Sequence, residues 1–158
     1  MSALGFQAFQ DTVTDNADIM TSAYRTLFRL ENFLRQFIES QMRAKYGSDW
    51  WDKHVSAAVK AKVDEMRQHE HSMSWQVSEV NSNTEYLLFD HLQKIIMINW
   101  IDVFRPLFGE QAKIDLRLKE LESIRNSIAH ARRLSLDGMN RLEQYSQDLL
   151  NMMNVGTT

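Results

Sequence analysis

The stretch from Arg125 to His130 places polar side chains that can do chemistry on an otherwise apolar helical pattern. A guanidinium stays protonated and offers a fork of charged donors, so Arg125 suits an anion such as a phosphate. The imidazole of His130 can accept or donate a proton. Asn126 and His130 stand four residues apart, a spacing that makes side chains neighbours on one helix face. The motif therefore combines an anion binder with a proton-transfer group.

Arg125 also lies in an apolar stripe. The run 114–131 carries apolar residues at helical spacing: Ile114, Leu118, Leu121, Ile124 and Ile128. At about 100° per residue, Arg125 falls between Leu121 and Ile128. Because an unpaired buried guanidinium is very unfavourable, this face must meet an anion, a carboxylate or a second subunit.

A second polar pair interrupts the apolar stripe of an earlier helix. Glu31 and Arg35 are four residues apart and fall among Leu27, Phe28, Leu34 and Ile38. One interpretation is an ion pair within the helical bundle. The other is that the pair faces the cleft that Arg125 enters, with Glu31 orienting Arg125. Both interpretations are open at the level of the sequence.

The elements that must position these residues are predicted to be helices. Apolar spacing, caps and breakers favour an all-α bundle of about five helices in one domain, 1–158, with its core at about 20–153. The predicted segments are a weakly patterned helix or arm within 1–19, then 21–46 (capped by Thr21 or Ser22, with Tyr24 and Phe28 in its apolar stripe), 51–69, 90–105 (capped by Asp90), 111–133 and 139–152. Residues 72–86 are predicted to form a loop with a short extended piece, and 154–158 a frayed tail.

Composition points to a soluble protein of a reducing compartment. The chain of 158 residues has 44% hydrophobic and 25% charged residues and no Cys, which fits a cytoplasmic protein without disulfides. We expect no secretory leader, because the first residues lack a basic start and a long apolar run. The most apolar run, 87–104, is interrupted by Asp90, His91, Lys94 and Asp102, so we expect no membrane span.

Charge is unevenly distributed along the chain. Residues 1–22 carry three acids and no Lys or Arg, whereas 23–46 carry five basic and two acidic residues. Residues 113–141 carry seven basic and four acidic residues, and Arg132 and Arg133 follow the motif without a neighbouring acid. Positive charge beside a polar cluster favours a phosphate-bearing ligand, although a solvated helix face would have the same composition.

The motif and its surroundings resemble the HEPN superfamily. RNSIAH, at 125–130, matches the R-x4-H signature of that superfamily, with Asn126 as the polar residue after the Arg. The runs YRTLFRLENFLRQFI, YGSDWW, LLFDHLQKIIMINWIDVFRPLF and LKELESIRNSIAHARRLS are similar to the Swt-type branch, and the likeness covers about 20–150. Arg132 stands where HEPN toxins with a nucleotidyltransferase antitoxin often carry a Tyr, so modification at that position is not expected.

The resemblance implies a metal-independent RNA endonuclease of the toxin or phage-defence type, without a cofactor. It implies a homodimer formed through the motif helix, with Arg125, His130 and Asn126 in a shared catalytic site, Glu31 and Arg35 as orienting residues, and Arg132 and Arg133 in contact with RNA. An antitoxin or sensor would be a separate chain. Two alternatives stay open: a catalytically inactive HEPN module that binds RNA, a nucleotide or a regulatory protein, and a structural partner that docks an acidic protein.

Two further features carry weaker expectations. His69 and His71 are two residues apart and point to different sides of a helix, so we expect no metal site there. The adjacent Trp50 and Trp51 can stack on bases if they are exposed, but buried aromatic residues are the ordinary case in a bundle.

Overall fold

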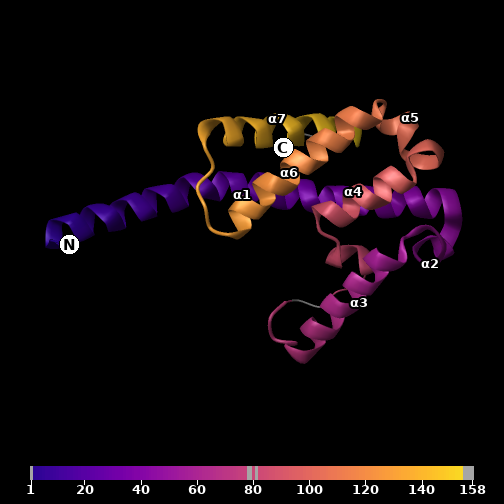
Figure 1. Ribbon diagram of the computed structural model, residues 1–158, viewed down its shortest axis with the longest axis horizontal. Coiled ribbons are helices and arrows are strands. Elements are labelled where there is room, and N and C mark those ends of the chain that lie inside the picture. Colours follow the sequence, from indigo (N-terminus) through magenta and orange to yellow (C-terminus); the bar gives the residue numbers. More distant parts are fainter. Residues whose placement is uncertain (1, 78–79, 81, 155–158) are drawn as a thin grey trace.

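Helices make up nearly all of the computed structural model, which describes residues 2–77, 80 and 82–154 (Figure 1). The α-helices are α1 (Ala3–Tyr46), α2 (Trp50–His54), α3 (Ala57–Ser72), α4 (Phe89–Ile98), α5 (Arg105–Phe108), α6 (Gln111–Ala129) and α7 (Leu136–Met152). Single helical turns connect them: η1 (Gly47–Asp49), η2 (Asn83–Tyr86) and the π-helical turn η3 (Trp100–Phe104). The described residues contain no strand, which confirms the predicted all-α class.

α1 is one continuous helix of 44 residues, so the prediction of a separate helix starting at Thr21 or Ser22 was wrong. Instead of capping a new helix, the hydroxyl of Thr21 donates to the carbonyl of Ala17 at 3.1 Å, and that of Ser22 donates to Ile19 at 3.1 Å. Neither Pro nor Gly occurs between residues 5 and 47, so nothing breaks the backbone ladder. At 1.5 Å per residue the helix is about 66 Å long.

The core forms where the long helices cross. Figure 1 shows α6 crossing α1, while α7 lies along α1 and α4 packs on α6. The buried apolar residues of α1 are Ala23, Leu27, Leu30, Leu34, Ile38 and Met42. Those of α6 are Ile114, Leu118, Leu121 and Ile124, as the apolar spacing predicted. The two faces pack together and hold the motif at the C-terminal end of α6 against the middle of α1.

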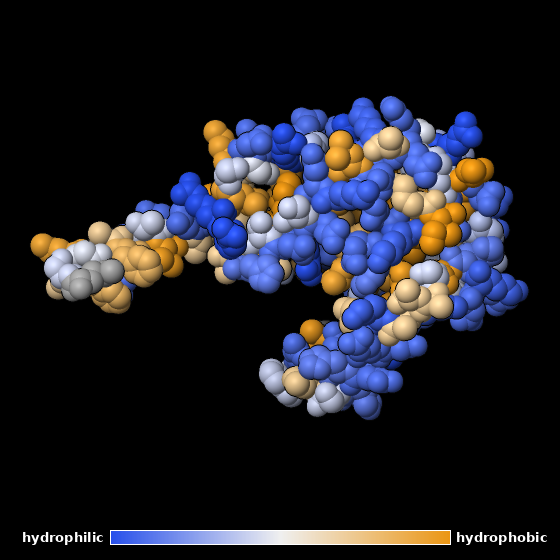
Figure 2. Space-filling model, in the orientation of Figure 1, coloured by the Kyte–Doolittle hydropathy of each residue, from blue (hydrophilic) through white to orange (hydrophobic). Residues whose placement is uncertain are grey.

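The N-terminal half of α1 extends beyond the bundle (Figure 1). Two aromatic residues that we expected in the core stripe are exposed, Tyr24 to 57% and Phe28 to 55%, although Ala23, Leu27 and Leu30 are buried. The prediction failed because apolar spacing also includes residues at the edge of the stripe, which the neighbouring helices leave uncovered. Apolar side chains gather on this projecting segment in the space-filling view (Figure 2).

The predicted fourth helix is divided in two. Asp90 lies in the first turn of α4 and does not cap it, and α4 ends at Ile98. The side chain of Asn99 donates to the carbonyls of Ile95 at 2.9 Å and His54 at 3.3 Å, where the ladder passes into η3. Pro106 stands in the first turn of α5, where its missing N–H breaks no hydrogen bond.

The predicted helix 51–69 is divided as well. Val55 and Ser56 are extended between α2 and α3, and the side chain of Ser56 caps α3, which runs three residues beyond the predicted 69. Within the predicted loop, Asn83–Tyr86 form the 3-10 turn η2. The predicted frayed tail, 154–158, lies outside the described residues from 155 onward. In the part of the chain that the structure describes, no helix combines the length and the apolarity that a membrane crossing requires.

Candidate active site at the end of helix α6

The motif ends α6. The last helical residue is Ala129 and His130 is the C-cap, so the prediction that the helix reaches Arg133 was wrong. The N–H of Arg132 donates to the carbonyl of Ser127 at 2.9 Å and that of Ala131 to Ile128 at 3.0 Å, the pattern of a Schellman motif. Ala131 takes the left-handed conformation, with φ of 56°, at the position where Gly is usual. Without a Gly, the sequence gives no signal for this helix end.

Arg125 is half-buried and lies against a carboxylate of α1. Its side chain is 27% exposed, and its Nε is 4.0 Å from Oε1 of Glu31. Its Nη1 donates to Oδ1 of Asn126 at 3.4 Å. The apolar stripe allowed an anion, a carboxylate or a second subunit beside Arg125, and the single chain supplies a carboxylate. The Arg125 side chain still keeps partial access to solvent.

Glu31 lies between two guanidinium groups. Nη2 of Arg35 is 3.5 Å from the same Oε1, and the two side chains are only 15% and 12% exposed. Arg35 is fixed from outside the pair as well, because its Nε donates to the carbonyl of Leu87 at 2.8 Å and its Nη1 to Asn32 at 3.4 Å. The two interpretations of this pair coincide: it is an ion pair within the bundle, and its acid also faces Arg125.

Burial dominates the electrostatics of this cluster. It raises the pKa of Glu31 above the ordinary value, against the lowering effect of Arg35 and Arg125. Burial also lowers the pKa of Arg35, against the raising effect of Glu31. Among the described residues Oε1 of Glu31 has no hydrogen bond, although both guanidinium groups lie near it. Glu85 also acts on Arg35, so the cluster contains two acids and two guanidinium groups. Arg125 is the more exposed of the two cations, so it is the one that an anionic ligand reaches more readily.

His130 stands apart from this cluster. It is exposed, and its imidazole has no hydrogen-bond partner within the described part of the chain. No hydrogen bond joins its side chain to that of Asn126 among the described residues; the backbone N–H of His130 donates to the carbonyl of Asn126 at 3.0 Å. Arg125 and His130 are five residues apart, which turns their side chains about 140° away from each other around the helix axis. A single chain therefore brings the Arg together with Glu31, Arg35 and Asn126, but does not bring the His to them.

Arg132 and Arg133 are exposed in the segment that follows α6. Nη1 of Arg133 donates to Oδ1 of Asn16 on α1 at 2.7 Å, which ties this segment to the projecting part of that helix. Both Arg side chains line a pocket of about 570 Å³, together with Val13, Asn16, Ala17, Met20, Thr21, Tyr24, Ile128 and Ala131. The sequence analysis missed this pocket, because it depends on the unbroken course of α1.

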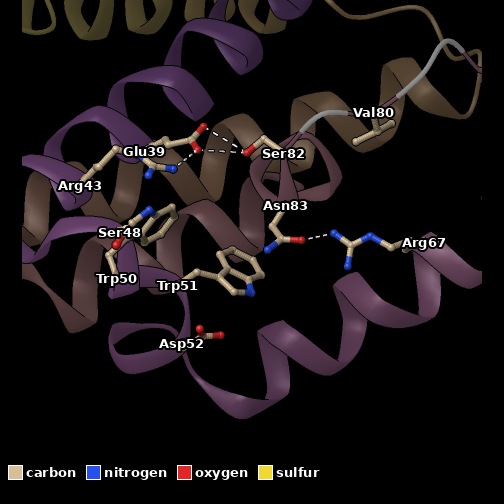
Figure 3. A pocket seen from close by; sticks show the side chains of 10 residues that line it. All are labelled: Glu39, Arg43, Ser48, Trp50, Trp51, Asp52, Arg67, Val80, Ser82 and Asn83. Carbon is tan, nitrogen blue, oxygen red and sulfur yellow. Dashed lines mark hydrogen bonds and ion pairs between the residues drawn. The ribbon is translucent and has the colours of Figure 1, made fainter.

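A second cavity lies far along α1 from the motif (Figure 3). It measures about 370 Å³ and is lined by Glu39, Arg43, Ser48, Trp50, Trp51, Asp52, Arg67, Val80, Ser82 and Asn83. The carboxylate of Glu39 accepts hydrogen bonds from Ser82 and Thr84, and the side chain of Arg67 donates to Asn83. Trp50 is buried and cannot stack on a base, whereas Trp51 is half-buried at the wall. The polar groups here are largely paired with each other, which indicates a structural role.

The histidines of α3 form no metal centre in the structure as described. His69 and His71 are exposed, and the described residues contain no group of three His, Asp or Glu side chains placed to hold a metal ion.

Comparison with known proteins identifies one family. A sequence model of the family described as Swt1-like HEPN matches residues 25–154, from the middle of α1 to the end of α7. Neither the curated proteins nor the solved structures contain a match. The matched region includes the whole bundle and the motif at the end of α6, and the all-α fold agrees with it. The chain therefore belongs to the Swt1-like HEPN family.

Proposed function

We propose that this protein is a metal-independent RNA endonuclease of the toxin or phage-defence type and that it works as a homodimer. The observation that carries the proposal is the arrangement at the end of α6. A half-buried guanidinium that keeps access to solvent lies five residues before an exposed imidazole at the helix end. Phosphate binding and proton transfer are the two functions that cleavage of an RNA chain requires.

The reaction needs only groups that the chain and the RNA supply. The 2′-oxygen of one ribose attacks the adjacent phosphorus and forms a new P–O bond, while its proton passes to a base. The bond from phosphorus to the 5′-oxygen of the next nucleotide breaks, and that oxygen takes up a proton. The products are a 2′,3′-cyclic phosphate and a free 5′-hydroxyl. His130 is the proton-transfer group, which typically contributes a factor of about 10²–10⁴.

Arg125 stabilises the negative charge that builds on the non-bridging oxygens, through its fork of donors. Glu31 and Arg35 are positioning residues, since Glu31 lies beside Arg125 and Arg35 fixes Glu31 through its own bond to Leu87. Asn126 orients the phosphate beside the guanidinium to which it is hydrogen-bonded. Arg132 and Arg133 bind the neighbouring phosphates, so binding weakens as salt rises.

A second copy explains the divided arrangement. In one chain Arg125 faces Glu31 while His130 points to solvent. Two motif helices related by a two-fold axis supply two Arg and two His side chains to one cleft. In that cleft the His of one copy acts on a phosphate held by the Arg of the other.

The test is cleavage of structured RNA by purified protein in the presence of EDTA. We expect His130→Ala to reduce the cleavage rate by at least about 100-fold, since proton transfer is lost, while RNA binding stays within a few-fold. His71→Ala, which removes an exposed His at the end of α3, is the matched control and retains full activity. Equal cleavage by wild type and His130→Ala would contradict the proposal.

The second candidate is an inactive HEPN module that binds RNA or a regulatory protein. It is favoured by the ion contact of Arg125 with Glu31, because a carboxylate of the same chain can hold the guanidinium in place without a substrate. Binding of RNA without cleavage, unchanged by His130→Ala, would select this candidate.

A further inference from the structure

The pocket of about 570 Å³ beside the motif, here called the motif-end pocket, lies between the projecting half of α1 and the segment that follows α6 (Figure 1). Its volume is within the range of about 300–1,000 Å³ that is usual for small-molecule sites. The apolar part of its wall consists of Val13, Ala17, Met20, Tyr24, Ile128 and Ala131. The polar part consists of Asn16, Thr21, Arg132 and Arg133. An occupant that matches this wall combines an apolar body with polar or charged groups.

The two cations of the pocket have no acid partner. Within the described part of the chain no ion pair involves Arg132 or Arg133, and Arg133 donates to the uncharged side chain of Asn16 at 2.7 Å. At about 100° per residue, the acids of the projecting half of α1 fall on the side of the helix away from the pocket: Asp11, Asp15 and Asp18. Two guanidinium groups without acids nearby favour an occupant that carries negative charge.

Tyr24 is the aromatic residue of the pocket wall. Its side chain is 57% exposed, and its ring is supported by Phe28, whose centroid lies 6.1 Å away and which does not line the pocket. An exposed ring of this kind is a surface on which a nucleobase can stack. Asn16 accepts from Arg133 through Oδ1, which leaves its amide N–H groups for the polar edge of a base.

The motif-end pocket also adjoins the candidate active site. Ile128 of its wall follows Arg125 by three residues and lies about 4.5 Å further along α6. On α1, Tyr24 stands seven residues, or about two turns, before Glu31, so both are on the same side of that helix. Because Glu31 contacts Arg125, an RNA chain with its scissile phosphate at Arg125 reaches the pocket with a base close to the cleavage point.

We propose that the motif-end pocket binds one unpaired base of the RNA substrate, stacked on Tyr24, with the adjacent phosphates on Arg132 and Arg133. This inference rests on the proposed function and adds that the substrate is single-stranded beside the cleavage point. A base within a duplex is paired and stacked on its neighbours, whereas bases of loops and bulges can turn outward onto aromatic side chains. Tyr24 then determines specificity, because cleavage requires an unpaired base at a fixed distance from the bond that breaks.

The test is RNA binding by the full chain carrying His130→Ala, which leaves the RNA intact. The probes are a single-stranded RNA of about 12 nucleotides, its duplex, and inorganic polyphosphate of similar charge, which has no bases. We expect Tyr24→Ala to weaken binding of the single strand by about tenfold or more, and to leave the other two probes within about twofold. Tyr24→Phe keeps the ring and should bind like the parent. Arg132→Ala/Arg133→Ala should weaken all three probes, since it removes phosphate contacts.

Phe6→Ala is the matched control for the loss of an aromatic side chain. Phe6 is an exposed aromatic residue of the same helix, at 53%, and it lies outside the pocket. We expect this variant to bind the three probes like the parent. Weakening of the single strand and of polyphosphate to the same degree by Tyr24→Ala overturns the base pocket, as does no weakening at all.

A second readout uses cleavage by the protein with His130 intact. In an RNA that is cut at one place, each nucleotide in turn is replaced by an abasic one. We expect one position, at a fixed distance from the cut, to slow the wild type by about tenfold, and Tyr24→Ala to be insensitive at that position. A purely structural role of Tyr24 would lower the rate at every position alike and would overturn the proposal.

The base pocket and the nuclease proposal can fail separately. Loss of cleavage with His130→Ala, together with Tyr24→Ala that changes neither binding nor the abasic profile, overturns the base pocket and leaves the nuclease standing. Selective weakening of the single strand by Tyr24→Ala in a chain that cleaves no RNA supports the base pocket and overturns the nuclease. A wild type that binds no RNA overturns both.

Discussion

At the scale of single residues, Glu31 is the side chain that connects α1 to the motif. It is largely buried, it faces Arg35 at 3.5 Å and Arg125 at 4.0 Å, and its burial raises its pKa. An acid whose pKa is raised on folding contributes most to stability when it is protonated. That contribution is complete below the unfolded pKa and is lost as the pH rises through the folded one.

We therefore expect the stability of wild type relative to Glu31→Gln to fall as the pH rises from below 4.5, the unperturbed value, toward neutral. The amide of Gln carries no charge at any of these pH values, so it lacks this dependence. Chemical unfolding of both proteins across that pH range measures the difference. Asp18→Asn, at an exposed position of α1, serves as the control. If the stability of wild type relative to Glu31→Gln instead rises with pH, the two guanidinium groups outweigh the effect of burial on Glu31.

From the residue types we predicted the contacts of Arg125 correctly, but not the place where the motif helix ends. A carboxylate beside Arg125 was one expected solution for a guanidinium in an apolar stripe, and Glu31 was the acid on a neighbouring apolar face. The position of His130 as the C-cap of α6 was not predictable, because the helix ends at a residue that gives no breaker signal. The need of a buried guanidinium for a partner can be predicted from the residue itself. The end of a helix depends on the backbone conformation of the segment that follows it.

At the scale of elements, the C-terminal end of α6 holds Ala131 in the left-handed region, at φ of 56°. This conformation is unfavourable for a residue with a Cβ by about 1–2 kcal/mol. It is kept because two backbone hydrogen bonds, from Ala131 and Arg132, close the helix end.

We expect Ala131→Gly to raise the free energy of unfolding by about 1 kcal/mol, since Gly adopts this conformation without strain. For a chain of this size the midpoint of thermal unfolding rises by about 2–4 °C. Ala61→Gly, at an exposed position inside α3, is the matched control and should destabilise by about 1 kcal/mol. Equal effects of the two substitutions would show that residue 131 is not strained.

Apolar periodicity located the helices because it reports the side that packs, and the buried residues of α6 follow it closely. Apolar periodicity did not locate the boundaries between helices. Thr21 and Ser22 resemble caps by type, yet their hydroxyl groups bond to carbonyls of the preceding turn and α1 continues. The π-helical turn after α4 depends on the buried side chain of Asn99, whose bond to the carbonyl of His54 is a contact distant in sequence. Such contacts exist only once the chain is folded.

At the scale of the whole molecule, the proposed active site belongs to two chains. Arg125 and His130 leave α6 in different directions, so each copy supplies only one of them to a given phosphate. The shared cleft then needs one intact Arg and one intact His, and these can come from different copies.

We therefore expect that Arg125→Ala and His130→Ala, each inactive alone, restore cleavage when they are co-expressed. Half of the dimers are then mixed, and each retains one of its two complete sets, so activity on the order of a quarter of wild type is expected of the whole mixture. Heterodimers purified through a different tag on each copy are expected to have about half of the wild-type activity, and their cleavage of RNA measures it. Heterodimers as inactive as the two parents would place the Arg and the His that act together in the same chain.

The unbroken course of α1 has one more consequence. The projecting N-terminal segment of α1, residues 3–20, and Glu31 belong to one helix about 66 Å long, and neither Pro nor Gly lies between them after residue 5. A second copy or an inhibitor that binds the free end is therefore connected to Glu31, the acid beside Arg125, by one unbroken helix. Binding outside the bundle can thus change the position of Glu31 relative to Arg125, and with it the electrostatics beside the motif.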